Sequence, residues 1–286
     1  MGITGPACFG FERSWFSKAI RCLPDNPGLF DASQEREAQF TLGLGNRQVR
    51  ALEYWLRCSG VTQREDGSTK LTPFGELICE FDPRVEEPET WFAIHHHLSA
   101  DRERASTYWF AFRRMPLSFS RSEMLAALEQ EFPGKSERTY RDAVSILLSI
   151  IDRTEIGSLC RLARIKDGYV VKEEPSLLKA SHLAYSICSW AEESAFRTAH
   201  VSQVLSEDGP AKPLSLSEET LLRLLNRIQQ RYRKRVLWIS RTAGLNSVVF
   251  AEGVESLAVL RACYLEHLQG MEPVEALRGA LNGRTP

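Results

Sequence analysis

The chain lacks the features that mark several common protein classes. No apolar run approaches the ~20 residues that a membrane-spanning helix needs, and no secretory signal segment is recognisable. Seven cysteines are scattered at positions 8, 22, 58, 79, 160, 188 and 263 without a C-x-x-C pair. This pattern argues against a disulfide framework and against a zinc site. We therefore expect a reduced, cytoplasmic protein with no membrane partner.

An excess of charge of either sign is also missing. The 36 Lys and Arg residues face 37 Asp and Glu residues, so the formal net charge is −1. Nothing in the total charge therefore argues for nucleic acid, and any such contact must come from local clusters. Walker, nucleophile-elbow and kinase motifs are absent as well. What remains is an ordinary globular composition, with 43% hydrophobic residues over a length of 286.

Residues 42–61, LGLGNRQVRALEYWLRCSGV, predict a helix with two chemically different faces. At about 100° per residue, Val49, Leu52 and Leu56 share one face. The opposite face carries Tyr54 and three arginines, namely Arg47, Arg50 and Arg57. Only Glu53 lies at its edge, whereas a solvated helix usually mixes acids and bases. The pattern fits a DNA-contacting face and a plain solvated surface about equally.

The segment that follows this helix favours the DNA interpretation. Asp66-Gly67 predicts a hairpin turn between two short strands, and residues 71–80 predict a returning helix. Helix, hairpin and return is the order of a winged-helix unit. Arg64 and Lys70 on this hairpin would add phosphate contacts from a second element. The Gly43-x-Gly45 pair lacks the rest of a dinucleotide fingerprint, so we predict a turn there.

The same order of elements recurs in the middle of the chain. Ser120 and Glu123 have the spacing of a capping box, and a helix follows with Arg138 and Arg141 on its polar face. A second hairpin is predicted at residues 166–168, KDG. Arg138 and Arg141 are DNA-binding candidates, although acidic neighbours weaken this interpretation.

A third set of the same elements is predicted after the linker SEDGPAKPLSLS. A helix capped by Ser217 or Ser215 runs to about Arg235, two strands flank residues 243–244, and a last helix spans about 256–269. Arg227 and Arg231 share a face of the first helix with Arg223, at spacing i, i+4 and i+8. Arg227 and Arg231 are therefore DNA-binding candidates, and an ion-paired surface is the equal alternative.

Together these patterns predict a mainly α protein of the α+β class, with several winged-helix-like units and small hairpins. Its predicted modules are 1–115, 116–205 and 206–286, and the first includes two packed helices in residues 86–114, buried on one side. That pair contains His95-His96-His97. Neighbouring residues of a helix diverge by about 100°, which argues against a metal site. His95 is kept as a general-base candidate, because imidazole titrates near neutral pH.

Several stretches, in this order, resemble a bacterial family long described as being of unknown function, which includes the SspB proteins. The stretches are LGLGNRQVRALEYWL, LTPFGELI, EPETWFAIHHHL, TYWFAF, FSRSEM, SLCRLARI and ISRTAGLNSVVF. The resemblance extends from about Gly5 to Leu268. It implies a DNA-acting component of the Ssp system, which installs phosphorothioate linkages in DNA.

The resemblance also implies an activity and partners. SspB-type proteins nick DNA, and a divalent metal such as magnesium is a cofactor candidate if this chain does the same. The implied partners are duplex DNA, a cysteine desulfurase, an ATP-dependent sulfur-transfer enzyme and an ATPase. Many relatives carry a Gly-His-Glu-Thr-Phe-like motif where this chain has Gly5-Pro6-Ala7-Cys8-Phe9. The missing His and Glu weaken the nicking hypothesis more than the DNA-binding hypothesis.

Two other hypotheses remain open at this point. A non-catalytic adaptor would use its arginine faces to bind acidic surfaces on the sulfur-transfer enzymes, in keeping with a net charge near zero. A ligand-sensing transcription regulator is the other, since winged helices often serve that role. Sequence-specific binding of a dimer to a palindromic site would distinguish the regulator.

Overall fold

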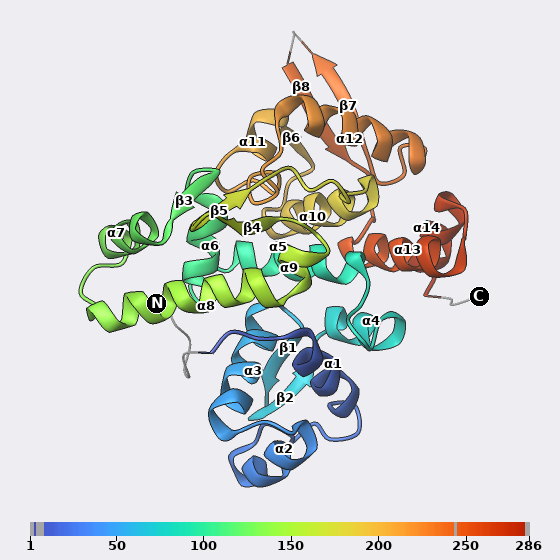
Figure 1. Ribbon diagram of the computed structural model, residues 1–286. Helices are drawn as coiled ribbons and strands as arrows, with labels where there is room; N and C mark the ends of the chain where they lie inside the picture. Colours follow the sequence, from blue (N-terminus) through green and yellow to red (C-terminus); the bar gives the residue numbers. More distant parts are fainter. Residues whose placement is uncertain (1–2, 4–8, 243–244, 284–286) are drawn as a thin grey trace. The chain divides into compact units, whose positions relative to one another are not determined.

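The computed structural model describes residue 3, residues 9–242 and residues 245–283 (Figure 1). The chain forms two compact units, Met1–Glu173 and Glu174–Pro286. Their boundary falls between neighbouring glutamates that bind within different units. Glu173 pairs with Arg164 in the first unit, and Glu174 accepts a hydrogen bond of 2.6 Å from the Ser217 amide in the second. Helices dominate both units, and the three sheets are small and antiparallel, so the predicted α+β class is confirmed.

The first part of unit 1 combines short helices with one hairpin (Figure 1). Its elements are α1 (Arg13–Cys22), the 3₁₀ turn η1 (Ala32–Gln34), α2 (Glu35–Leu42), α3 (Asn46–Cys58), β1 (Thr62–Glu65), β2 (Ser68–Leu71) and α4 (Pro73–Phe81). Glu65 pairs with Ser68, so Asp66 and Gly67 form the predicted two-residue turn. Both have positive φ, 51° and 85°, as a type I′ turn requires.

Two helices form the centre of unit 1, α5 (Pro88–Ala100) and α6 (Ser106–Arg113). Ten of the 13 residues of α5 are buried, and so are all eight residues of α6. The prediction that this pair is buried on one side was therefore wrong, because neighbouring elements cover it almost completely. A helix that is apolar and aromatic around most of its circumference is expected in such a central position.

The rest of unit 1 repeats the order strand, helices, hairpin. Its elements are β3 (Ser118–Ser120), α7 (Arg121–Glu131), α8 (Glu137–Arg153), α9 (Glu155–Ser158), β4 (Ala163–Lys166) and β5 (Tyr169–Lys172). The strands lie in the order β3-β5-β4. The predicted capping box starts α7, since the Ser120 amide donates to Glu123 Oε2 at 2.6 Å and the Glu123 amide donates to Ser120 Oγ at 3.2 Å.

Unit 2 has the same arrangement, followed by two more helices. Its elements are α10 (Ala180–Glu193), β6 (Thr198–His200), α11 (Val201–Leu205), α12 (Glu218–Arg231), β7 (Leu237–Thr242), β8 (Leu245–Phe250), α13 (Ser256–Gln269) and α14 (Pro273–Leu281). The strand order is β6-β8-β7. Ser217 rather than Ser215 caps α12, accepting from the Thr220 amide at 3.2 Å. The predicted turn at 243–244 lies outside the described residues.

Two sequence predictions differ from this arrangement. Helix α12 ends at Arg231 instead of Arg235, because Arg233 and Lys234 adopt φ of 47° and 61° and turn the chain. The three modules 1–115, 116–205 and 206–286 also differ from the two units. Strand β6 lies in the second predicted module but pairs with β8 of the third. No helix in the described ranges is long and apolar enough to cross a membrane.

Candidate nucleic-acid interface

Helix α3 has the two faces that its sequence predicts. The Gly45 amide donates to Gln48 Oε1 at 2.9 Å at the start of the helix. Gly43 ends α2 with φ of 65°, a conformation that glycine adopts without strain. The Gly43-x-Gly45 pair is therefore the predicted turn between two helices. The buried side of α3 consists of Val49, Leu52, Trp55 and Leu56.

The opposite side carries Arg47, Arg50 and Arg57, which we call the arginine face. Arg47 and Arg50 are exposed, and Arg57 is partly buried. Arg47 lies over the Phe9 ring at 5.6 Å, and Arg50 Nη2 lies 3.8 Å from Glu35 Oε2 of α2. Arg57 has no ion pair among the described residues. The arginine face therefore has an acidic neighbour that the sequence of α3 did not indicate, because Glu35 belongs to another helix.

The two predicted DNA contacts of the β1–β2 hairpin, Arg64 and Lys70, lie on opposite faces of the hairpin. Arg64 pairs with Thr69 across the hairpin and lies 3.5 Å from Glu53 Oε1 of α3. Lys70 pairs with Gln63 in the sheet and lies 3.1 Å from Glu65 Oε2. Successive residues of a strand point to opposite faces. Arg64 therefore faces α3, and Lys70 faces the other way.

A cavity of about 340 Å³ brings three of the predicted cations together. Arg50, Arg57 and Arg64 all line it, with Tyr54 of the same helix. Lys70 instead lines a separate hollow with Glu65 and residues of α4. Unit 1 thus gathers its cations along α3 and one side of the hairpin.

The second pair of predicted contacts, on α8, is exposed but internally paired. Arg138 lies 3.8 Å from Asp142, and Arg141 lies 2.5 Å from Glu137. Both pairs have the i, i+4 spacing, with the acid after the base in the first and before it in the second. Such exposed pairs contribute only about 0.3–0.5 kcal/mol, so they leave the arginines available for exchange with a phosphate.

Unit 2 holds a larger basic groove of about 1040 Å³. We call it the basic groove because five cationic side chains line it: Lys179, Arg227, Arg231, Arg233 and Arg278. Arg231 Nε donates to Glu266 Oε2 at 2.7 Å, and the Glu266 side chain is only 5% exposed. The arginine spacing on α12 was visible in the sequence. Lys179 and Arg278 had no signal there, because α10 and α14 bring them in only after folding.

His95, the general-base candidate, lies in the core. Its residue is 1% exposed, and its Nδ1 lies 2.7 Å from the hydroxyl oxygen of Tyr108. The Phe112 ring packs 4.8 Å away. A general base for strand cleavage must reach the strand, so this position does not support that role. Within either unit taken by itself, the described residues bring no three metal-ligand atoms within 4.8 Å of one another.

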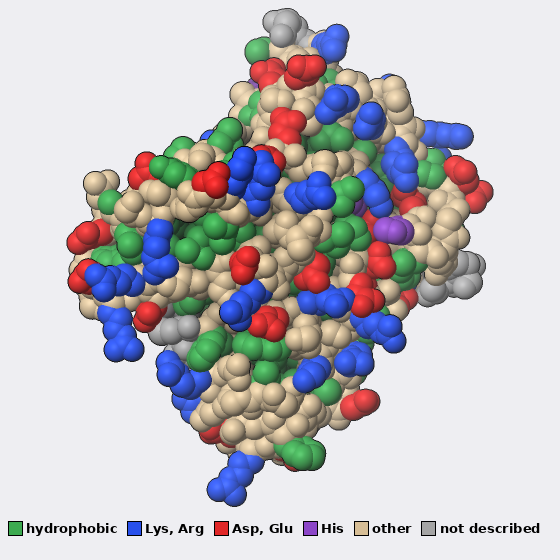
Figure 2. Space-filling model, in the orientation of Figure 1, with side chains coloured by type: hydrophobic (Ala, Val, Ile, Leu, Met, Phe, Trp, Pro, Cys, Tyr) green, Lys and Arg blue, Asp and Glu red, His purple; other side chains and the backbone are tan. Residues whose placement is uncertain are grey.

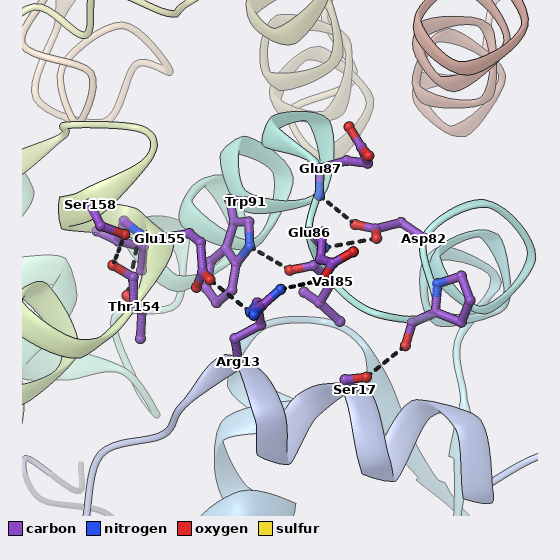
Figure 3. A network of polar contacts seen from close by, with 12 residues as sticks. Arg13, Ser17, Asp82, Val85, Glu86, Glu87, Trp91, Thr154, Glu155 and Ser158 are labelled. Carbon is purple, nitrogen blue, oxygen red and sulfur yellow. Dashed lines mark hydrogen bonds and ion pairs between the residues drawn. The ribbon is translucent and has the colours of Figure 1, made fainter.

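A partly exposed polar network beside α5 had no signal in the sequence (Figure 3). Arg13 of α1 reaches Glu86 at 2.7 Å and Glu155 at 2.9 Å. Asp82 accepts from the amides of Glu86 and Glu87 at 2.8 and 3.0 Å. Burial raises the pKa values of Asp82 and Glu155. The network joins α1, α9 and the α4–α5 connection, and its role is structural.

Residues 6–149 match a family model described as "Protein of unknown function (DUF4007)". The chain belongs to the DUF4007 family. Two crystal structures of SspB, one of them bound to magnesium, resemble this DUF4007 protein with TM-scores of 0.76 and 0.75. Each SspB chain is 18% identical to this chain, and the match covers 96% of this chain and 95% of the SspB chain. The likeness shows a shared fold over nearly the whole length. No curated protein matches this DUF4007 chain.

The comparisons bear on the sequence interpretation in two ways. The resemblance to the SspB family is confirmed at the level of the fold. The departure noted at Gly5 to Cys8 lies outside the described residues.

Proposed function

We propose that this chain is a DNA-binding component of an Ssp-type DNA phosphorothioation system. The observation that carries the proposal is the arginine face, a set of exposed and half-buried guanidinium groups on a helix whose other side is buried. The SspB fold over 96% of the chain supports the choice of system. A cysteine desulfurase, a sulfur-transfer enzyme and an ATPase are the partners that follow from it.

The element order supports a docking mode for this face. In both the β3–β5 segment and the β6–β8 segment the last strand lies between the other two, an order that fits a winged-helix-like unit. The α2–α3–hairpin segment presents α3 directly before its hairpin, which is where such units place the groove-entering helix. Arg47, Arg50 and Arg57 would then contact phosphates along one groove, and Arg64 would contact them from the hairpin.

Internal ion pairing does not prevent this use of the cations. Six of the nine predicted contacts have an acidic partner within the chain: Arg50, Arg64, Lys70, Arg138, Arg141 and Arg231. Their side chains are 42–90% exposed, and exposed pairs contribute about 0–1 kcal/mol. Arg231 is the exception, because its partner Glu266 is only 5% exposed. Phosphates of a duplex offer denser negative charge, together with the release of counterions.

The test is the triple substitution Arg47→Ala, Arg50→Ala and Arg57→Ala. We expect weaker binding to duplex DNA and a plot of log K against log salt that is flatter by roughly 3, since each lost phosphate contact removes about 0.9. Arg21, Arg84 and Arg153 are all exposed and belong to other elements, namely α1, the α4–α5 connection and α8, so their triple alanine variant is a control of equal charge. Equal affinities of the two variants would overturn the proposal.

The internal pairing also favours one alternative, an adaptor that binds proteins rather than DNA. An adaptor would not bind DNA by itself and would co-purify with a partner enzyme.

Supercoiled plasmid with Mg²⁺ or EDTA tests nicking in the same preparation. Open-circle product that EDTA abolishes would add nicking to the function, and a shifted but uncut plasmid would limit the chain to binding. Binding confined to a palindromic site would instead identify a regulator.

A further inference from the structure

The cavity beside α3 is more than a gap under the arginine face. Its volume of about 340 Å³ lies within the range of ligand-binding pockets. We call it the α3 pocket. The 29–35 segment, α2, α3 and Arg64 of β1 enclose it, and apolar side chains form part of the wall: Leu29, Phe30, Ala32, Ala38 and Val49.

The polar wall of the α3 pocket carries both signs of charge. Arg50, Arg57 and Arg64 contribute three cations, and Asp31, Glu35 and Glu53 contribute three carboxylates. A simple anion would meet repulsion from the carboxylates, and a simple cation would meet repulsion from the arginines. The lining suits a ligand that carries an anionic group at one end and hydrogen-bond donors at the other.

Two acceptors in this wall lack donors. Asp31 Oδ1 and Asn46 Oδ1 are shielded from solvent, and no described residue hydrogen bonds to either. Buried acceptors in folded proteins are almost always paired, so each exception needs an explanation. Asp31 can only accept while it is ionised. An N–H donor on a bound ligand would satisfy it once the carboxylate rotates toward the pocket, because Oδ1 is shielded while the pocket is empty.

Tyr54 adds an aromatic surface that is held in place. It lines the α3 pocket, and its hydroxyl donates to the backbone carbonyl of Arg104. Its ring packs edge-on against Trp55, with ring centroids 5.3 Å apart. Nucleic-acid bases stack on fixed aromatic rings and on the planes of arginine side chains.

From these features we propose that the α3 pocket binds one nucleotide whose base carries an exocyclic amino group. The base would lie against Tyr54, with its amino group donating to Asp31 as cytosine donates to carboxylates in sequence readout. The phosphate would bind Arg57, which has no ion pair among the described residues. The nucleotide is either free in solution or a unit extruded from DNA. This second source deepens the proposed DNA binding and rests on it.

The first experiment measures free nucleotides by calorimetry on the full chain. We expect dCMP, dAMP or dGMP to bind at least tenfold more tightly than dTMP, which lacks the amino group. Asp31→Ala and Arg57→Ala should each lower this affinity at least tenfold. Arg84→Ala is the matched control, because Arg84 is exposed in the α4–α5 connection and does not line the α3 pocket. Circular dichroism and thermal melts confirm that each variant is folded.

The second experiment uses a duplex with 2-aminopurine at its centre, whose fluorescence rises when the base leaves the stack. We expect a rise with the wild-type chain and with Arg84→Ala at saturating protein, and none with Asp31→Ala at matched occupancy of the DNA. Either experiment with its expected variant pattern supports the pocket and identifies the source of the nucleotide.

The outcomes separate this proposal from the proposed function. If duplex DNA binds, but no free nucleotide binds and 2-aminopurine stays dark, the pocket proposal is overturned and DNA binding stands. Pocket variants that behave like Arg84→Ala in both experiments overturn it equally. If free nucleotides bind with the expected pattern and duplex DNA does not, the pocket stands and the proposed function fails.

Discussion

Two neighbouring histidines of α5 are held neutral by the interior of unit 1. Burial lowers the pKa of His97 to about 4 and that of His96 well below its ordinary value. The unfolded chain takes up protons at these residues near pH 6.5, whereas His97 of the folded chain does so only at about pH 4 and His96 only well below its ordinary pKa. Their contribution to stability is therefore complete above pH 6.5 and is lost as the pH falls toward 4.

We expect the free energy of unfolding to fall in this window by about 1.4 kcal/mol per pH unit for each proton taken up on unfolding. Urea titrations at a series of pH values measure it. His97→Phe should reduce the slope, because phenylalanine takes up no proton. The Phe74 ring 4.8 Å away offers the new side chain an apolar neighbour. The exposed His200 is the control, and a His200→Gln variant should keep the wild-type slope. A slope unchanged in His97→Phe would contradict the assignment.

The same residue scale shows where sequence reasoning fails. Lys172 is 4% exposed, and its ammonium donates to the carbonyls of Ala111 and Met115 at 2.7 and 2.8 Å. In the sequence it is one more charged residue of a hairpin strand. Glu35 likewise reaches Arg50 only through the turn between α2 and α3. Both roles depend on contacts made by folding, so no local pattern announces them.

At the scale of elements, local signals are far more informative. The Asp66-Gly67 turn, the Ser120–Glu123 capping box and the two faces of α3 were each predictable, because each depends on residues within one turn or one helix. Helix α14 was missed, and α12 was extended by four residues. The positive φ of Arg233 and Lys234 that ends the latter has no glycine or proline to mark it.

The packing of α4 on the first hairpin gives a prediction at this scale. A Cβ at Gly75 would lie 2.1 Å from the backbone oxygen of Val61, and that oxygen also accepts from the Thr72 amide at 3.0 Å. Replacing a helical glycine with alanine normally stabilises by about 1 kcal/mol. Here we expect Gly75→Ala to destabilise by about 3 kcal/mol, because α4 must move away from the hairpin. Chemical denaturation measures the change.

Glu76 provides the comparison, since it is the next residue of α4 and is exposed. Glu76→Ala should change the free energy of unfolding by no more than about 0.5 kcal/mol. A Gly75→Ala variant as stable as Glu76→Ala would mean that α4 does not pack on the hairpin in this way.

At the scale of the whole molecule, charge is balanced and only its local distribution is distinctive. Residues 1–173 contain 23 Lys and Arg against 25 Asp and Glu, and residues 174–286 contain 13 against 12. Figure 2 accordingly shows basic and acidic side chains interspersed over the visible face. Long-range attraction to DNA should therefore be weak, and the proposed binding would depend on the arginine face in unit 1 and the basic groove in unit 2.

If both surfaces serve one duplex, their contributions should add. We expect Arg227→Ala with Arg278→Ala to weaken duplex binding, and its free-energy cost to add to that of the arginine-face triple variant within about 0.5 kcal/mol. The salt slope of the combined variant should be flatter than that of the wild type by roughly 4 to 5, at about 0.9 per lost contact. Arg231 is left in place because it neutralises the buried Glu266. Filter binding at four salt concentrations measures both quantities. A unit 2 variant with wild-type affinity and slope would restrict the DNA surface to unit 1 and leave the basic groove for a protein partner.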